Sequence, residues 1–214
     1  MANRIIVPLD GSDRAAIALD PARSLGERLG CPVTVLSSVE SRDEPERRAA
    51  VGRQLVSYGL PADTDVLVSA EPDVAALIAV TASHHRSIVC MSTHGRTGLG
   101  RAILGSVAES AIAHSTDAGF LLVGPQYQRT PDLGRAVLLA VDGGSHAAVA
   151  GQWARDLALA LRVPLWVVSV LQPGTPTPNG VEQNHVENVA RALGADGGPE
   201  VDWDVLHRHD PADA

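Results

Sequence analysis

The chain has 214 residues, of which 45% are hydrophobic, 17 are basic and 25 are acidic, giving a net charge of −8 with neutral histidines. This apolar content is too high for a disordered chain, and the length fits one large domain or two small ones. The acidic balance provides no basic surface for a nucleic-acid backbone, which argues against DNA or RNA as a partner.

The sequence also argues against a membrane protein and against a protein stabilised by disulfides. No apolar run approaches the ~20 residues that a transmembrane helix needs, and the apolar run near the N-terminus is too short for a signal peptide. The two cysteines, Cys31 and Cys90, are isolated in sequence, so they form neither a disulfide framework nor a zinc site. We therefore expect a cytoplasmic protein that does not contact a membrane.

Strand and helix patterns alternate along the first 124 residues. The continuous apolar run Arg4–Leu9 predicts a buried strand, and helical spacing follows from the expected cap Ser12 to Gly30. The same reading predicts further strands at Val33–Val39, Asp65–Ser69, Ser87–Met91 and Gly119–Val123, with helices at Glu44–Leu60, Asp73–His84 and Gly105–His114. Such alternation predicts an α/β fold with an open parallel five-stranded sheet and helices on both faces.

An internal repeat extends this organisation. Ile5–Val39 aligns without a gap on Val137–Leu171 at an offset of 132, which places Asp10-Gly11 on Asp142-Gly143. This alignment predicts a second copy of the strand–helix–strand unit. We expect Trp153 to lie in the core of that copy.

The repeat continues less regularly. Asp65-Val66-Leu67 aligns with Asp204-Val205-Leu206 at an offset of 139, which implies seven extra residues in the second copy. We assign them to the Pro- and Gly-rich stretch Pro173–Gly180, because that composition is typical of a loop. Trp166, on the second strand of this copy, is also expected to be a core residue.

These patterns predict a domain at 1–126 and a partial second domain at 133–214 that contains only the first three strands. No counterpart of Ala76–Pro125 precedes Ala214. Either the chain is truncated from a longer tandem protein, or the partial domain packs against another surface.

A glycine-bearing loop follows the expected strand at Ser87–Met91 and leads into the expected helix at Gly105–His114. Free backbone N–H groups and a favourable helix dipole make this position of an α/β sheet suitable for binding anions. His94, Arg96 and Arg101 add positive charge. On composition alone, a plain surface turn is an equally good interpretation.

Two residues beside this loop have alternative roles. Ser106 begins a Ser-x-x-Glu capping-box pattern with Glu109, so its hydroxyl could cap the helix or donate to a phosphate. Asp10 could bind a ligand or stabilise a turn through a nearby N–H. Asp142 at the equivalent position of the second copy favours the turn role.

The loop resembles the nucleotide pattern G-x2-G-x9-G-(S/T) of the universal stress protein family, with Ser92 at the first glycine position, Gly95 at the second and Gly105-Ser106 at the end. The segment Ile6–Ser12 resembles the first strand and turn of that family. The resemblance implies a nucleotide α-hydrolase-like sheet of order 3-2-1-4-5 and an ATP site at the carboxyl ends of strands one and four.

The same resemblance assigns residues to this site. Asp10 would meet the adenine–ribose end, and Ser38 would line the base pocket. The remaining expected site residues are Pro8 and Leu9 beside Asp10, Met91, Ser92, Gly95, Gly105, Ser106 and Val107 around the ribose and phosphates, and the charged loop residues His94 and Arg96.

The resemblance implies an ATP-binding regulator in stress response, with Mg²⁺ accompanying the nucleotide and at most slow hydrolysis, because no general base is evident at the phosphate end. The alternative is an interaction module of the same fold that does not bind nucleotide. In that case the apolar strand 119–123 would form a homodimer. An adenylating ligase is a weaker alternative, since the Ser-Gly-Gly-x-Asp-Ser and His-Ile-Gly-His signatures are absent from the sequence.

Overall fold

The computed structural model describes residues 2–39, 43–83, 87–93, 105–115, 118–124, 126–128, 134–142, 144, 147–171 and 181–207. The chain divides into two compact units, which span Ala2–Leu133 and Gly134–Ala214. Each unit contains one parallel sheet with its own core. No helix among the described residues is long and apolar enough to span a bilayer.

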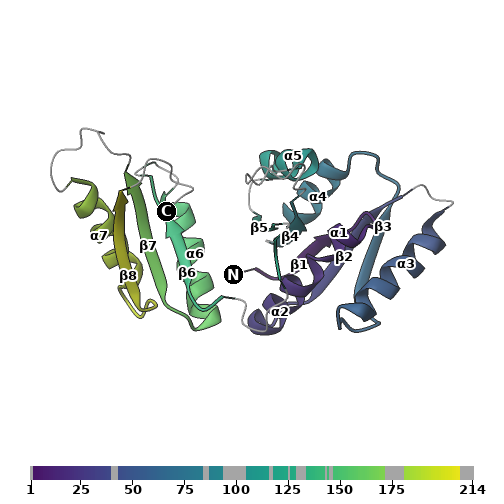
Figure 1. Cartoon of the computed structure of the whole chain (residues 1–214), viewed down its shortest axis with the longest axis horizontal. Helices are drawn as coiled ribbons and strands as arrows, with labels where there is room; N and C mark the ends of the chain where they lie inside the picture. Colours follow the sequence, from purple (N-terminus) through teal and green to yellow (C-terminus); the bar gives the residue numbers. More distant parts are fainter. Residues whose placement is uncertain are drawn as a thin grey trace. The chain divides into compact units, whose positions relative to one another are not determined.

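The first unit is built on a five-stranded parallel sheet (Figure 1), which confirms the predicted fold class and strand order. Its strands are β1 (Ile5–Pro8), β2 (Val33–Ser38), β3 (Asp65–Ser69), β4 (Ile88–Ser92) and β5 (Gly119–Val123), in the order β3-β2-β1-β4-β5. β1 pairs with β2 along its whole length, but it pairs with β4 only at Ile5↔Ile88 and Ile6↔Val89. Beyond these pairs β1 and β4 separate, so a crevice opens at their carboxyl ends.

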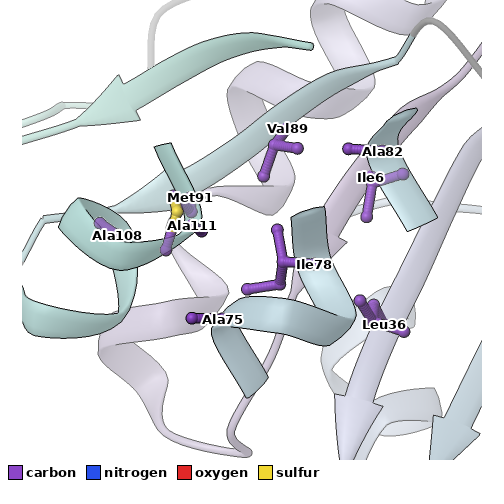
Figure 2. Close-up of a cluster of buried hydrophobic side chains, with 9 residues drawn as sticks. All are labelled: Ile6, Leu36, Ala75, Ile78, Ala82, Val89, Met91, Ala108 and Ala111. Atoms are coloured by element: carbon purple, nitrogen blue, oxygen red, sulfur yellow. The ribbon is translucent and has the colours of Figure 1, made fainter. Parts of the chain in front are cut away.

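The helices of this unit are α1 (Asp13–Ala16), α2 (Leu19–Leu29), α3 (Glu44–Ser57), α4 (Val74–Ser83) and α5 (Ser106–His114). α4 and α5 pack against one face of the sheet, where Ile78 and Ala111 meet Ile6 and Val89 (Figure 2). The opposite face meets the α1–α2 segment, since the Cys90 thiol donates to Ala18 O at 3.3 Å. The sheet is therefore covered on both sides, as the alternating pattern predicted.

The helix predicted from Ser12 to Gly30 is interrupted. Ser12 caps α1 as expected, with its Oγ accepting from Ala15 N at 3.1 Å. The chain then turns at Ile17–Ala18 before α2 begins. Pro21 explains the break, because proline has no N–H to donate to Ile17 O and its ring would collide with that carbonyl in a continuous helix. In α2, Pro21 occupies the first turn, where the missing N–H has no helical partner.

The second unit contains a three-stranded parallel sheet in the order β6-β7-β8, formed by β6 (Val137–Ala140), β7 (Leu165–Leu171) and β8 (Val201–His207). Its helices are α6 (Ala147–Leu161) and α7 (Val181–Gly194). The first strand pair repeats the register of the first unit, because Val137↔Leu165 lies 132 residues after Ile5↔Val33. The aligned segments thus occupy equivalent positions in the two sheets.

The register of the third strand differs from the sequence alignment. Thr34 pairs with Asp65, whereas the equivalent residue Trp166 pairs with Asp202, so the offset is 137 rather than 139. The second copy therefore contains five extra residues, not seven. The error of two residues preserved the facing of every side chain, since strand side chains alternate with period two. The stretch Pro173–Gly180, to which the insertion was assigned, lies outside the described residues.

Both described helices of the second unit pack on one face of its sheet, where Leu139, Ala158 and Val186 form the core. On the other face, Leu138 is 66% exposed and its strand neighbour Trp166 is 40% exposed. The equivalent residues of the first unit, Ile6 and Thr34, are buried. Trp166 is therefore not a core residue as predicted, because no described helix of this unit covers its face, whereas Trp153 is half-buried on α6.

Candidate functional site

A pocket of about 400 Å³ lies at the carboxyl ends of the strands in the first unit. This volume is typical of small-molecule sites, which measure about 300–1,000 Å³. Its position agrees with the rule that open α/β sheets bind ligands where the strand order reverses. The lining residues are Pro8, Leu9, Asp10, Ala15, Leu36, Ser38, Val74, Leu77, Met91, Ser92, Gly105, Ser106, Val107 and Ala108.

The structure brings together nine of the twelve residues that the sequence predicted for the site: Pro8, Leu9, Asp10, Ser38, Met91, Ser92, Gly105, Ser106 and Val107. The other three, His94, Gly95 and Arg96, lie outside the described residues. Sequence reasoning missed five lining residues, namely Ala15, Leu36, Val74, Leu77 and Ala108. The composition of α4 carried a signal for two of them, because its sequence Val-Ala-Ala-Leu-Ile-Ala-Val is apolar on every side.

Part of the pocket lining is apolar. It includes Val74 and Leu77 on α4, Leu36 on β2 and Met91 on β4. Leu36 and Met91 also belong to the buried core beneath α4 and α5 (Figure 2). The pocket therefore borders directly on this core. A rigid, flat, apolar ligand group such as an aromatic base suits these surroundings.

The turn after β1 places Asp10 at the pocket. The carboxylate Oδ1 of Asp10 accepts a hydrogen bond from Ser12 N at 2.9 Å, which forms an Asx turn. Arg47 on α3 donates through Nη1 to the carbonyl of Asp10, and Gln54 Nε2 donates to Gly11 O at 3.2 Å. Two side chains of α3 thus hold the backbone of this turn. Asp10 therefore stabilises the turn, as one of its two expected roles required, and it also lines the pocket.

The N-terminus of α5 also lines the pocket. Gly105 is the N-cap residue and makes no side-chain capping bond. Ser106 is the first residue within the helix and is exposed, so the predicted capping box with Ser106 as the cap is wrong. The Ser106 side chain and the first N–H groups of α5 therefore face a region suited to anions.

Ser92 stands at the position where the family pattern has glycine. It is the last residue of β4 and is 7% exposed. Side chains alternate along a strand, so Ser92 shares the face of Cys90, whose thiol contacts Ala18, and points away from the face of Met91. The Cβ of Ser92 is therefore directed toward the α1 side of the crevice rather than toward α5.

Ser38 ends β2, and its Oγ donates to Glu71 O at 2.6 Å. This bond joins the end of β2 to the loop between β3 and α4. The bond holds Ser38, a residue of the pocket lining, in place.

The described residues argue against a metal site and against a reactive cysteine. Within the described segments, no group of three or more His, Cys, Asp or Glu residues could hold a metal ion. Cys90 lies outside the pocket lining, and burial raises the pKa of its thiol to about 12. The thiol is thus protonated at neutral pH, as expected of a core residue rather than a redox switch.

These features define an open α/β protein whose pocket lies at the reversal point of its sheet. The chain belongs to the universal stress protein family, whose family model matches residues 1–117. No curated protein matches the chain.

Three solved structures illustrate the fold. A universal stress protein from Archaeoglobus fulgidus is 16% identical with a TM-score of 0.69, and the match covers 97% of this chain and 79% of that one. A functionally unknown protein from Pseudomonas aeruginosa is 17% identical with a TM-score of 0.59, over 95% and 74% of the two chains. The cytoplasmic domain of a prokaryotic cation chloride cotransporter is 18% identical with a TM-score of 0.53, over 100% and 81%. At these identities the similarity shows the fold alone.

Proposed function

We propose that this protein binds an adenine nucleotide, ATP accompanied by Mg²⁺, in the pocket of its first unit, and acts as a nucleotide-dependent regulator in stress response. The observation that carries the proposal is that apolar side chains and a helix N-terminus line the same pocket. An apolar wall at Leu36, Val74 and Leu77 is joined to the N-terminus of α5 at Gly105 and Ser106 within one cavity of about 400 Å³. Membership of the universal stress protein family supports the same conclusion.

The apolar lining residues and the helix N-terminus suit the two parts of a nucleotide. The base would lie against the apolar wall, and the ribose would lie beside Asp10. The phosphates would meet the N–H groups at the start of α5 and the Ser106 hydroxyl, where the helix dipole favours negative charge. His94, Gly95 and Arg96 are expected to join this end. Mg²⁺ would be held mainly by the phosphates and water, its usual arrangement with nucleotides.

The role is one of binding rather than catalysis. Efficient phosphoryl transfer needs a group that orients the attacking nucleophile and a metal that neutralises the developing charge. Asp10, the one acidic residue among the described lining residues, belongs to the turn after β1 and would meet the ribose rather than the terminal phosphate. We therefore expect at most slow hydrolysis of ATP, which release of inorganic phosphate over several hours would measure.

Isothermal titration of the full chain with ATP and Mg²⁺ tests the proposal. Binding with one site per chain, accompanied by an increase in melting temperature, is the expected result. Repeating the titration with EDTA separates the contribution of Mg²⁺. No heat and no thermal stabilisation at millimolar ATP would reject nucleotide binding.

A second part of the proposal concerns self-association. β5 is an edge strand of the first sheet, and its side chain Leu122 is 39% exposed. An apolar edge strand can pair with the same strand of a second copy about a two-fold axis. We expect a homodimer through strand 119–123, and Leu122→Lys should shift it to monomer in light scattering at tens of micromolar. A monomeric wild-type chain under these conditions would contradict this part.

A further inference from the structure

One face of the sheet in the second unit carries apolar side chains that no described helix of that unit covers. α6 and α7 pack on the other face, where Leu139, Ala158 and Val186 form the core. On the uncovered face, Leu138 is 66% exposed and Trp166 is 40% exposed. A parallel sheet is normally buried on both faces, because helices cover each of them. Exposed apolar side chains gathered on one such face indicate an interaction surface.

The same face also carries negative charge. Trp166 lies beside Leu138 on β6 and beside Asp202 on β8, and paired residues of neighbouring strands share a face. Two residues further along β8, Asp204 lies on this face too, because side chains alternate along a strand. Both aspartates are exposed. The uncovered face is therefore apolar on β6 and β7 and carries two carboxylates on β8.

The first unit shows what covers the equivalent face of its own sheet. Leu138 corresponds to Ile6 at the offset of 132 that the strand register repeats. Ile6 is buried in a core that it shares with Ile78 of α4 and Ala111 of α5 (Figure 2). An α-helix is therefore the kind of element that packs on this face of the repeated unit.

The dimensions of the uncovered face fit one helix. Neighbouring strands lie about 4.8 Å apart, so β6 and β8 are separated by about 10 Å, which is the diameter of an α-helix with its side chains. β7 has seven residues, which span about 20 Å along the strand. A helix of about 14 residues has the same length.

The two carboxylates define the charge that such a helix needs. Asp202 and Asp204 are two residues apart on one strand, so their Cα atoms lie about 7 Å apart. Positions i and i+4 of a helix lie on the same side and about 6 Å apart along the axis. Two Arg or Lys residues at this spacing would meet both carboxylates while the apolar side of the helix covers Leu138 and Trp166.

The same charges disfavour two other occupants. If a second copy used the same face, a two-fold axis along or across the strands would bring β8 onto β6 or β8 onto β8. The first arrangement sets Asp202 and Asp204 against the apolar Leu138, and the second brings four carboxylates together. An anionic membrane surface would also be repelled by these carboxylates.

We propose that the face defined by Leu138, Trp166, Asp202 and Asp204 binds one amphipathic helix of a partner protein. The helix is about 14 residues long and carries two basic residues four positions apart on the flank that lies over β8. Its apolar side buries Leu138 and Trp166, and its basic residues pair with the two carboxylates. This interaction surface lies on the second unit and does not depend on nucleotide binding.

Designed helical peptides test the inference with the full chain. The probe is a fluorescent peptide of about 14 residues, built from Ala, Leu and Gln with one apolar stripe and two Arg residues at four-residue spacing. A second peptide has Glu in place of both Arg residues, and a third has the composition of the probe with its Leu residues scattered around the helix. Fluorescence anisotropy should show micromolar binding of the probe and at least about tenfold weaker binding of the other two.

Variants with matched controls locate the surface. Leu138→Ser should weaken binding of the probe about tenfold, because apolar area buried by the helix is lost. Val149→Ser should bind as the wild type does, since Val149 is also 66% exposed but lies on α6. Asp202→Asn combined with Asp204→Asn should weaken binding about fivefold and reduce its dependence on salt. Asp65→Asn, at the equivalent position of β3, should change neither property.

The contradicting outcomes are specific. A wild-type chain that does not bind the probe at millimolar concentration, or that binds the Glu peptide equally well, would overturn the inference. So would unchanged binding in Leu138→Ser. If light scattering shows a wild-type dimer that Leu138→Ser disrupts, or if anionic vesicles bind the wild type but not this variant, the face has another occupant and the proposal is wrong. Melting temperatures check that each variant folds, and the peptide series on the wild-type chain decides if one does not.

Discussion

The side chain of Asp10 and the backbone of Ser12 form a hydrogen bond of 2.9 Å across the turn that follows β1. The second unit repeats it, with Gly144 N donating to Asp142 Oδ1 at 2.8 Å. The turn function of this aspartate is therefore common to both units. Asp10 also lies among the residues that line the cavity of the first unit. The two functions can be separated by a substitution that keeps the turn.

Asp10→Asn is that substitution, since an asparagine oxygen still accepts the bond from Ser12 N while the charge is lost. We expect the free energy of unfolding to change by less than about 0.5 kcal/mol. ATP affinity should fall about tenfold, because a bond from a ligand hydroxyl to a carboxylate is stronger than one to a neutral amide. Urea unfolding and isothermal titration measure the two effects.

Asp142→Asn provides the control for this change. It makes the same chemical substitution in the same kind of turn, away from the lining of the pocket. ATP affinity should stay at the wild-type value. An unchanged affinity in Asp10→Asn as well would show that the carboxylate serves the turn alone.

Ser12 and Ser106 offer a second test. Ser12 precedes α1 and caps it through a side-chain hydrogen bond, whereas Ser106 is the first residue of α5 and is not its cap. Ser12→Ala should lower the free energy of unfolding by about 1 kcal/mol through loss of the cap. Ser106→Ala should leave stability nearly unchanged and weaken ATP binding. If Ser106→Ala destabilises the protein as much as Ser12→Ala does, Ser106 acts as a cap after all.

Gly11 should resist replacement. Its φ of +85° is a conformation that favours glycine, and a Cβ built there collides with the guanidinium of Arg47. Gly11→Ala should cost about 1–2 kcal/mol and loosen the contact of α3 with the turn. Gly52→Ala, at a position on α3 with nothing within 4 Å, should instead stabilise the protein by about 0.5–1 kcal/mol. Thermal unfolding of both variants measures these changes in stability. If both substitutions stabilise the protein, or both destabilise it, the prediction is wrong.

Cys90 gives a prediction for alkaline pH. Burial raises the pKa of its thiol to about 12 in the folded protein. Above the ordinary thiol pKa the unfolded chain loses this proton while the folded chain keeps it, so stability falls as pH rises. Between pH 9 and 11 the wild-type chain should lose stability more steeply than Cys90→Ala, by about 1 kcal/mol per pH unit. Urea unfolding at pH 9, 10 and 11 measures how steeply stability falls in the two chains, and equal slopes would show that the thiol ionises freely in the folded state.

The fold of this chain could be predicted well because alternation and repetition are strong signals. The offset of 132 between the copies reappears in the strand register, since strand pairing fixes equivalent residues at equivalent positions. The break before α2 was missed, although Pro21 carried the signal. Trp166 was assigned to a core on hydrophobicity alone, which cannot indicate whether a helix covers that face of the sheet.

The candidate site was predictable only in part. Residues on the loops and strand ends could be found from the family pattern, but Val74 and Leu77 come from a helix that the pattern does not include. The role of Ser106 depended on which residue begins α5, a boundary that sequence reasoning locates only to within a few positions. The bond from Ser38 to Glu71 joins residues 33 positions apart, and no local pattern predicts it.

The central claim is that one pocket holds a base against α4 and a polyphosphate at the start of α5, and NMR titration of the isotope-labelled chain tests it most directly. With ATP, the amides of Gly105, Ser106 and Val107 and the methyl groups of Val74 and Leu77 should all shift. Adenosine should shift the methyl groups but leave the three amides unchanged. ATP that shifts neither set, or that shifts residues outside the pocket lining instead, would contradict the account.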